Sequence, residues 1–272
     1  MNENPVIGVF DSGFGGLTVL RALLSRIPHA RYEFLGDTAR LPYGSKSRRT
    51  IARYAAESAQ YLVRERGAEY LVIACNTASA LALDAIQEAV PVPVLGVIEP
   101  GAASARAASQ SGDVLVIATD ATVQSHAYAA ACRAQGLRAL EKACPLLVPL
   151  VEEGWTQHPV TEEVFRIYLD ELLRQSAEEG MSPDTLVLGC THYPLLRPLI
   201  AKAVPAGMRV IDSAEATADA AMRLFAQRCN GCAAPSDQIS CFATDSVEKF
   251  ERLGSRFLER PTGKVHLVEL DG

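Results

Sequence analysis

Two cysteines at matching points of the chain are the residues that point most directly to chemistry. Cys75 follows the apolar residues 71–74, Cys190 follows residues 186–189, and each precedes two polar residues and a helix-like segment. An apolar run that ends in such a turn is typical of a buried parallel strand. The turn would lie at the carboxyl end of its strand, where α/β sheets bind ligands, and near a helix N-terminus, which favours the thiolate. The pattern predicts a paired thiol site.

Two matched thiols suit a reaction that exchanges a proton on both faces of one carbon. Catalysis of acyl transfer normally needs one thiol and a histidine base. Inversion of a stereocentre instead needs one cysteine that removes a proton as thiolate and another that donates a proton as thiol. A carbon next to a carboxylate is a weak acid, so N–H and hydroxyl donors must stabilise the developing charge. An amino-acid substrate would also need an acidic residue for its ammonium group.

Three residues are candidate partners for the thiols. His192 lies two residues after Cys190 and is either a general acid/base or a polar residue at a helix start. Glu152 is either a carboxylate directed at the site or one of two adjacent solvated glutamates. Asp11 ends an apolar run and is either a catalytic group or a helix cap.

Two loops near the N-terminus could hold a ligand. The first contains Gly13, Gly15 and Gly16 before a helix-like segment, which suits anion binding. Thr18 occupies the last glycine position of G-x-G-x-x-G, and this argues against a nicotinamide or flavin cofactor.

The second loop, residues 37–44, is made rigid by Pro42 and Gly44. Its backbone and the Tyr43 hydroxyl could contact a ligand, or the loop is a simple connection.

The order of strands and helices repeats along the chain, and the two cysteines are 115 residues apart. We therefore expect an α/β fold with two pseudo-symmetric three-layer domains, mainly parallel sheets and an active site in the cleft between them. Residues 1–97 and 208–272 would form the first domain, and residues 98–207 the second. The segment Glu99-Pro100-Gly101 is predicted to break the chain between them as a hinge.

Composition narrows the class of protein. The net charge of −6 argues against nucleic acid or an anionic membrane as a partner, and no apolar run approaches the ~18 residues of a membrane span. Seven cysteines, an odd number, without a signal-type N-terminal segment indicate a reducing cytoplasm. Cys229 and Cys232 form a C-x-x-C pair without a second pair at zinc-finger spacing, so we expect no metal site.

Five stretches give the chain a resemblance to a known family, the glutamate racemases, which are cofactor-independent enzymes that supply D-glutamate for bacterial peptidoglycan. The stretches occur in the family's order and are residues 10–16 (FDSGFGG), 36–44 (GDTARLPYG), 74–78 (ACNTA), 148–152 (VPLVE) and 188–194 (LGCTHYP). Alanine stands at positions 118 and 121, where glycine is common in the family.

The resemblance implies a role for most of these residues. Cys75 and Cys190 would be the catalytic thiols, Asp11 would assist Cys75, and His192 would assist Cys190 with Glu152 nearby. The substrate contacts implied are Asp11, Ser12, Pro42, Tyr43, Gly44, Asn76, Thr77, Thr119, Thr122, Thr191 and His192. We further expect glutamate as the small-molecule partner, no cofactor, and a homodimer.

Three other functions remain open from the residues alone. A racemase of aspartate or another small amino acid would use the same two-thiol inversion. A decarboxylase or isomerase of similar fold would need one thiol. A two-lobed ligand-binding protein would need neither thiol for its activity.

Overall fold

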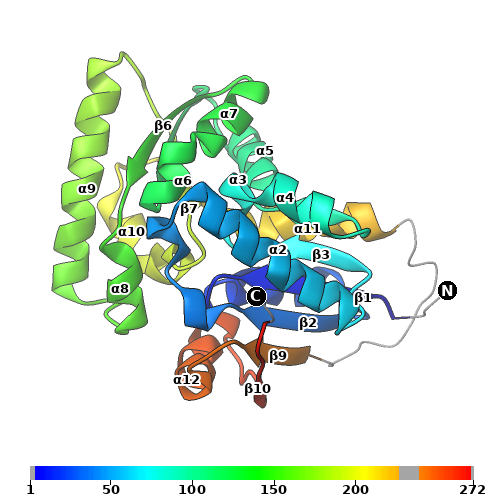
Figure 1. The fold of residues 1–272 in the computed structure, drawn as a ribbon. Coiled ribbons are helices and arrows are strands. Elements are labelled where there is room, and N and C mark those ends of the chain that lie inside the picture. Colours follow the sequence, from blue (N-terminus) through cyan, green and yellow to red (C-terminus); the bar gives the residue numbers. More distant parts are fainter. Residues whose placement is uncertain (1–3, 227–238, 271–272) are drawn as a thin grey trace. The chain divides into compact units, whose positions relative to one another are not determined.

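The computed structural model describes residues 4–226 and 239–270. Cys229 and Cys232, for which we expect no metal site, lie outside the described residues. The chain separates into two compact units, one of residues 1–97 with 214–272 and one of residues 98–213. Each unit has its own sheet (Figure 1).

The first unit is built on a six-stranded sheet of order β10-β9-β2-β1-β3-β4, in which every neighbouring pair is parallel. Its strands are β1 (Val6–Asp11), β2 (Arg31–Gly36), β3 (Tyr70–Ile73), β4 (Val94–Gly96), β9 (Ile239–Ala243) and β10 (Val265–Leu267). Its helices are α1 (Leu17–Arg26), α2 (Arg48–Arg64), α3 (Asn76–Leu81), α4 (Leu83–Ala89), α11 (Ser213–Ala226) and α12 (Val247–Leu258), with short 3₁₀ turns η1 (Thr38–Arg40) and η2 (Tyr43–Ser45).

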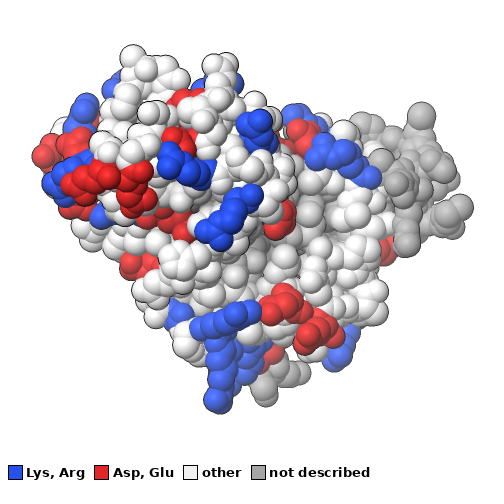
Figure 2. Space-filling model, turned by 90° about the horizontal axis from the view of Figure 1, so that it is seen from above, with Lys and Arg blue, Asp and Glu red and all other residues white. Residues whose placement is uncertain are grey.

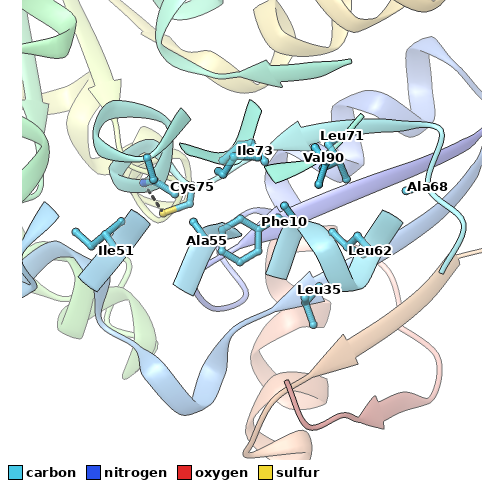
Figure 3. Close-up of a cluster of buried hydrophobic side chains, with 14 of the residues drawn as sticks. Phe10, Leu35, Ile51, Ala55, Leu62, Ala68, Leu71, Ile73, Cys75 and Val90 are labelled. Atoms are coloured by element: carbon cyan, nitrogen blue, oxygen red, sulfur yellow. Dashed lines mark hydrogen bonds between the residues drawn. The ribbon is translucent and has the colours of Figure 1, made fainter. Parts of the chain in front are cut away.

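Helices cover both faces of this sheet. Phe10 and Ile73 from the strands pack with Ile51 and Leu62 of α2 in a buried cluster that also contains Cys75 (Figure 3). On the opposite face, the ring of Phe34 meets that of Phe250 in α12 at 5.9 Å between centroids. The central strands β1 and β3 are buried on both faces and almost wholly apolar, as is usual for parallel sheets.

The second unit is built on a four-stranded sheet of order β6-β5-β7-β8, again with every pair parallel. Its strands are β5 (Asp113–Ala118), β6 (Arg138–Ala143), β7 (Thr185–Gly189) and β8 (Arg209–Asp212). Its helices are α5 (Ile98–Ala108), α6 (Asp120–Ser125), α7 (Ala127–Ala134), α8 (Leu147–Glu152), α9 (Pro159–Glu178) and α10 (Arg197–Ala203), with the 3₁₀ turn η3 (Tyr193–Leu196). The predicted α/β class with parallel sheets is confirmed.

The strand orders of the two units correspond. The order β2-β1-β3-β4 in the first unit matches β6-β5-β7-β8 in the second, with β9 and β10 added beyond β2. In the first unit the chain passes from β1 to β2 on one side and then to β3 on the other side of β1. In the second unit it passes in the same way from β5 to β6 and then to β7. The repeat expected from the sequence is therefore a repeat of topology.

Two expectations about chain organisation are wrong. The return to the first domain at residue 208 is too early, because β8 pairs with β7, with Leu186 opposite Val210, and belongs to the four-stranded sheet. The hinge at residues 99–101 is instead the first turn of α5. Pro100 is tolerated there because the first turn of a helix needs no N–H donor within the helix.

Candidate active site

Cys75 lies at the switch point of the first sheet. From β1 the chain passes through α1 to β2 on one side, and then through α2 to β3 on the other side of β1. Connections that diverge in this way open a crevice at the carboxyl ends of the two strands. Asp11 ends β1 and Cys75 follows β3, with Phe10 opposite Ile73 in the register. We call residues 74–77 the first thiol turn.

The Cys75 sulfur caps helix α3. The Ala78 backbone N–H donates to Sγ at 3.4 Å, and the thiol donates to Ser12 Oγ at 3.4 Å. Burial and the negative charge of Asp11 raise the pKa of Cys75 to about 12, and the hydrogen bonds with Ser12 and Ala78 offset them only in part. Cys75 is therefore a thiol at neutral pH.

The Asp11 side chain is held close to this turn by the backbone of the loop that follows β1. Its Oδ2 accepts the Gly13 N–H at 2.9 Å, and the side chain is buried. A Cβ on Gly16 would lie 2.6 Å from Asp11 Cβ and 2.7 Å from Ala74 Cβ. Glycine at position 16 therefore allows the loop after β1 to pack against the residue that precedes Cys75.

The other predicted substrate contacts of the first unit differ in how far they are buried. Asn76 and Thr77 are buried in the first turn of α3, and Ser12 is half-buried. Gly44 is half-buried, whereas Pro42 is exposed.

Tyr43 is buried, and its hydroxyl donates to Asp37 Oδ2 at 2.6 Å. Burial and the Asp37 carboxylate raise the pKa of Tyr43 well above its usual range. Because the proton of the hydroxyl is used in the bond to Asp37, the oxygen could only accept a hydrogen bond from a ligand.

Cys190 occupies the corresponding switch point of the second sheet. The chain passes from β5 to β6 on one side and returns to β7 on the other, with Ala118 opposite Gly189. Thr119 follows β5, and Cys190 follows β7. A Cβ on Gly189 would lie 2.9 Å from the Tyr128 ring and 3.0 Å from Ile117 O, so the strand ends in a glycine where packing leaves no room. We call residues 189–192 the second thiol turn.

The Cys190 sulfur is paired with an imidazole. Its Sγ lies 3.9 Å from His192 Nδ1, and His192 Nε2 lies 3.3 Å from Glu152 Oε1. Burial alone would lower the pKa of His192, but Cys190 and Glu152 outweigh it and raise the pKa to about 10. His192 is therefore an imidazolium at neutral pH, with both ring nitrogens as donors. Glu152 contacts His192, while the adjacent Glu153 is exposed.

The remaining predicted residues of the second unit lie around the same strand ends. The hydroxyls of Thr119 and Thr122 are 2.9 Å apart, and Thr122 is fully buried. Thr191 is buried beside His192, with Oγ1 at 3.5 Å from Nδ1. Alanine at positions 118 and 121 leaves both threonines at the start of α6.

Sequence reasoning missed the residues that support the two turns. The Tyr193 hydroxyl reaches Ala118 O at 3.2 Å and Cys144 O at 3.0 Å, and so ties the second thiol turn to the ends of β5 and β6. Asp37 receives hydrogen bonds from Tyr43, Arg40 and Thr244. Cys144 is 49 residues from Tyr193 and Thr244 is 207 residues from Asp37, so these pairings leave no local signal.

The described residues contain no cluster of three or more potential metal ligands. None of the helices within residues 4–226 and 239–270 has the length and apolar character needed to cross a membrane. On the face in Figure 2, basic and acidic side chains are both present, and neither sign covers the surface.

Comparison with known proteins gives consistent matches. Residues 17–221 match the model of the Asp/Glu/hydantoin racemase family. A glutamate racemase of Koribacter versatilis is 51% identical over 292 aligned residues that cover 99% of both chains. The crystal structure of a Francisella tularensis glutamate racemase in complex with D-glutamate covers 99% of both chains with 34% identity and a TM-score of 0.88.

A third match has the other enantiomer bound. The crystal structure of Escherichia coli glutamate racemase in complex with L-glutamate and an activator covers 99% of this chain and 100% of that chain, with 28% identity and a TM-score of 0.78. With its full-length relatives and its two parallel sheets, this chain belongs to the glutamate racemases of the Asp/Glu/hydantoin racemase family.

Proposed function

We propose that this protein interconverts L-glutamate and D-glutamate by proton transfer between the substrate α-carbon and two cysteines, Cys75 and Cys190. The observation that carries the proposal is the pair of thiol turns at equivalent strand ends. The full-length identity to a glutamate racemase supports glutamate as the substrate. The bound D-glutamate and L-glutamate of the two related structures support it further.

The proposed proton transfers use the different partners of the two cysteines. In one direction, the Cys190 thiolate beside the His192 imidazolium removes the α-proton, and the Cys75 thiol donates its proton to the opposite face of the carbanion. Cys190 is then a thiol and Cys75 a thiolate, so the opposite enantiomer reacts in the reverse direction. Glu152 contacts His192 rather than the sulfur and acts as a positioning residue.

The neighbouring polar groups would hold the substrate. Asp11 would receive the ammonium group, and Ser12, Asn76, Thr77, Thr119, Thr122 and Thr191 would supply hydroxyl, amide and backbone donors for the carboxylates. The loop of Pro42, Tyr43 and Gly44 would contribute backbone donors, because the Tyr43 hydroxyl already donates to Asp37. His192 would complete the site beside Cys190. We propose that the reaction needs no cofactor.

The biological setting follows from this activity. D-glutamate would serve peptidoglycan synthesis, and the reduced thiols that the mechanism needs suit a reducing cytoplasm. We further propose a homodimer, which sedimentation velocity at micromolar concentration tests directly. A monomer at that concentration would contradict the homodimer.

The experiment that tests the function is racemisation followed by circular dichroism, with L-glutamate and L-aspartate compared under the same conditions. We expect loss of optical activity with glutamate and a much slower change with aspartate. A preference for aspartate would favour the other racemase activity. Binding of glutamate without inversion would favour a ligand-binding protein.

A second measurement follows the proton itself. In deuterated water, racemisation should introduce one solvent deuteron at the α-carbon of each inverted glutamate, detected by NMR. Inversion without deuterium incorporation would contradict a mechanism in which the accepting and donating thiols are different groups.

A further inference from the structure

The loop of residues 37–47 joins β2 to α2 and carries Pro42, Tyr43 and Gly44. Much of it lies at the surface, since Ala39, Pro42, Ser45 and Ser47 are exposed. Three of its residues are buried: Asp37, Thr38 and Tyr43, whose ring packs between those of Phe10 and Tyr54. A loop with so few inward contacts depends on polar bonds to hold its shape.

Those bonds come from a distant part of the chain. Strand β9 pairs with β2 so that Ala243 lies opposite Gly36, and the residues after each strand therefore meet. The Thr244 hydroxyl donates to Asp37 Oδ1 at 2.9 Å and accepts the Ala39 N–H at 2.9 Å. One hydroxyl group thus bonds both the buried carboxylate and the backbone of the loop.

Asp245 extends this attachment through its backbone. Its N–H donates to Thr38 Oγ1 at 2.9 Å, and the Thr38 hydroxyl donates in turn to Asp245 O. Residues 37–39 are therefore bonded to residues 244–245 by both side-chain and main-chain groups.

Asp37 connects this attachment to the part of the loop that would meet substrate. While Oδ1 accepts from Thr244, Oδ2 accepts from the Tyr43 hydroxyl at 2.6 Å and from Arg40 Nε at 2.7 Å. The Asp37 backbone N–H also donates to Asp11 O at 3.0 Å. A shift of the Asp37 carboxylate would therefore move Tyr43 and the adjacent backbone donors.

We propose that Thr244 is a positioning residue that holds the loop of residues 37–47 in the conformation that binds substrate. Thr244 lies beyond residues 17–221, which match the family model. This inference rests on the proposed function, because it assigns substrate contacts to the loop.

The test compares three variants of the full chain. Thr244→Val keeps the shape of the side chain and removes the hydroxyl, whereas Thr244→Ser keeps the hydroxyl. Thr262→Val is the matched control, since Thr262 is buried in the same unit and its hydroxyl bonds to Gly263 O. Thr244→Val loses the bonds of the hydroxyl to Asp37 and Ala39. We expect it to raise the KM for glutamate about fivefold, with kcat within about twofold of the original.

Hydrogen exchange of residues 38–47 provides a readout that does not depend on activity. Exchange should be faster in Thr244→Val and unchanged in Thr244→Ser and Thr262→Val. The proposal is wrong if Thr244→Val leaves both KM and loop exchange unchanged, or if Thr262→Val raises KM equally. Absence of racemisation in the unsubstituted protein would instead overturn the proposed function, and the exchange comparison would still test the loop.

Discussion

The first and second thiol turns can be compared residue by residue, because their strands occupy the same places in two sheets of the same order. Both cysteines are buried and follow a strand next to the central strand. Their partners differ. The Cys75 sulfur bonds to Ser12 and the Ala78 N–H near the Asp11 carboxylate, whereas the Cys190 sulfur lies beside the His192 imidazole, which Glu152 supports.

The difference in partners gives the two sulfurs opposite electrostatic surroundings. An anionic Asp11 favours the protonated form of Cys75, whose pKa is raised to about 12. A cationic His192 favours a negative charge on its neighbour. A two-base inversion needs one sulfur that donates a proton and one that accepts it, and the unequal partners at equivalent positions suit these two roles.

The largest expected effect is loss of either thiol. Cys75→Ser and Cys190→Ser should each reduce racemisation by about a thousandfold or more, because a hydroxyl is a far weaker acid than a thiol at neutral pH. Circular dichroism with L-glutamate measures this. Cys241→Ala and Cys132→Ala, buried cysteines of the first and second units outside both turns, are the matched controls and should retain activity. Survival of inversion in either serine variant would remove the basis for comparing the two turns.

The next effect separates the partners of the thiols. His192→Asn and Asp11→Asn should each lower kcat/KM about a hundredfold, within the range for general acid–base groups. The equilibrium constant between enantiomers is one, so kcat/KM must fall equally in both directions. The asymmetry should appear in the isotope effect with α-deuterated substrate. The isotope effect should increase most for one enantiomer in His192→Asn and for the other enantiomer in Asp11→Asn. An increase for the same enantiomer in both variants would contradict separate partners for the two thiols.

A smaller effect is expected from Glu152→Gln, which removes one of the two groups that raise the pKa of His192 to about 10. The pKa should fall, and the alkaline limb of the kcat/KM profile should move to lower pH, with a loss of about tenfold near pH 9. Glu153→Gln changes the adjacent exposed carboxylate and is the control. Equal shifts in the two variants would mean that Glu152 acts only through general charge.

The smallest effect concerns stability. The pKa of His192 is higher in the folded protein, about 10, than its ordinary value of 6.5, so the folded state binds this proton more tightly. Its stabilising contribution is fully present below pH 6.5 and is lost as the pH rises through 10. The free energy of unfolding in urea should therefore fall between pH 6.5 and pH 9.5, and it should fall less in His192→Asn. An equal decrease in both proteins would contradict the assigned ion pair.

Local patterns predicted most strands and helices of the sheets. Clear apolar runs and flanking turns predict strands over residues 113–118 and 239–243 and a helix over residues 247–258, and β5, β9 and α12 have these bounds. Strand β6 was missed, since Arg138, Glu141 and Lys142 interrupt its apolar pattern at the edge of the sheet. The pattern predicts single helices over residues 77–89 and 123–135, but each is divided, the first at Ala82 and the second at His126. The backbone of His126 is left-handed.

The sequence alone determined the two thiol turns and the chemistry open to them, because a cysteine after an apolar strand is a local feature. The tertiary structure decided the partners. Only the packed fold brings Glu152 to His192 and Thr244 to Asp37, 40 and 207 residues away in the chain. Burial and the charge of Asp11 raise the pKa of Cys75, whereas Cys190 and Glu152 raise the pKa of His192 against the effect of burial. Pairing and desolvation depend on contacts between distant residues, so the spacing of residues carries no trace of them.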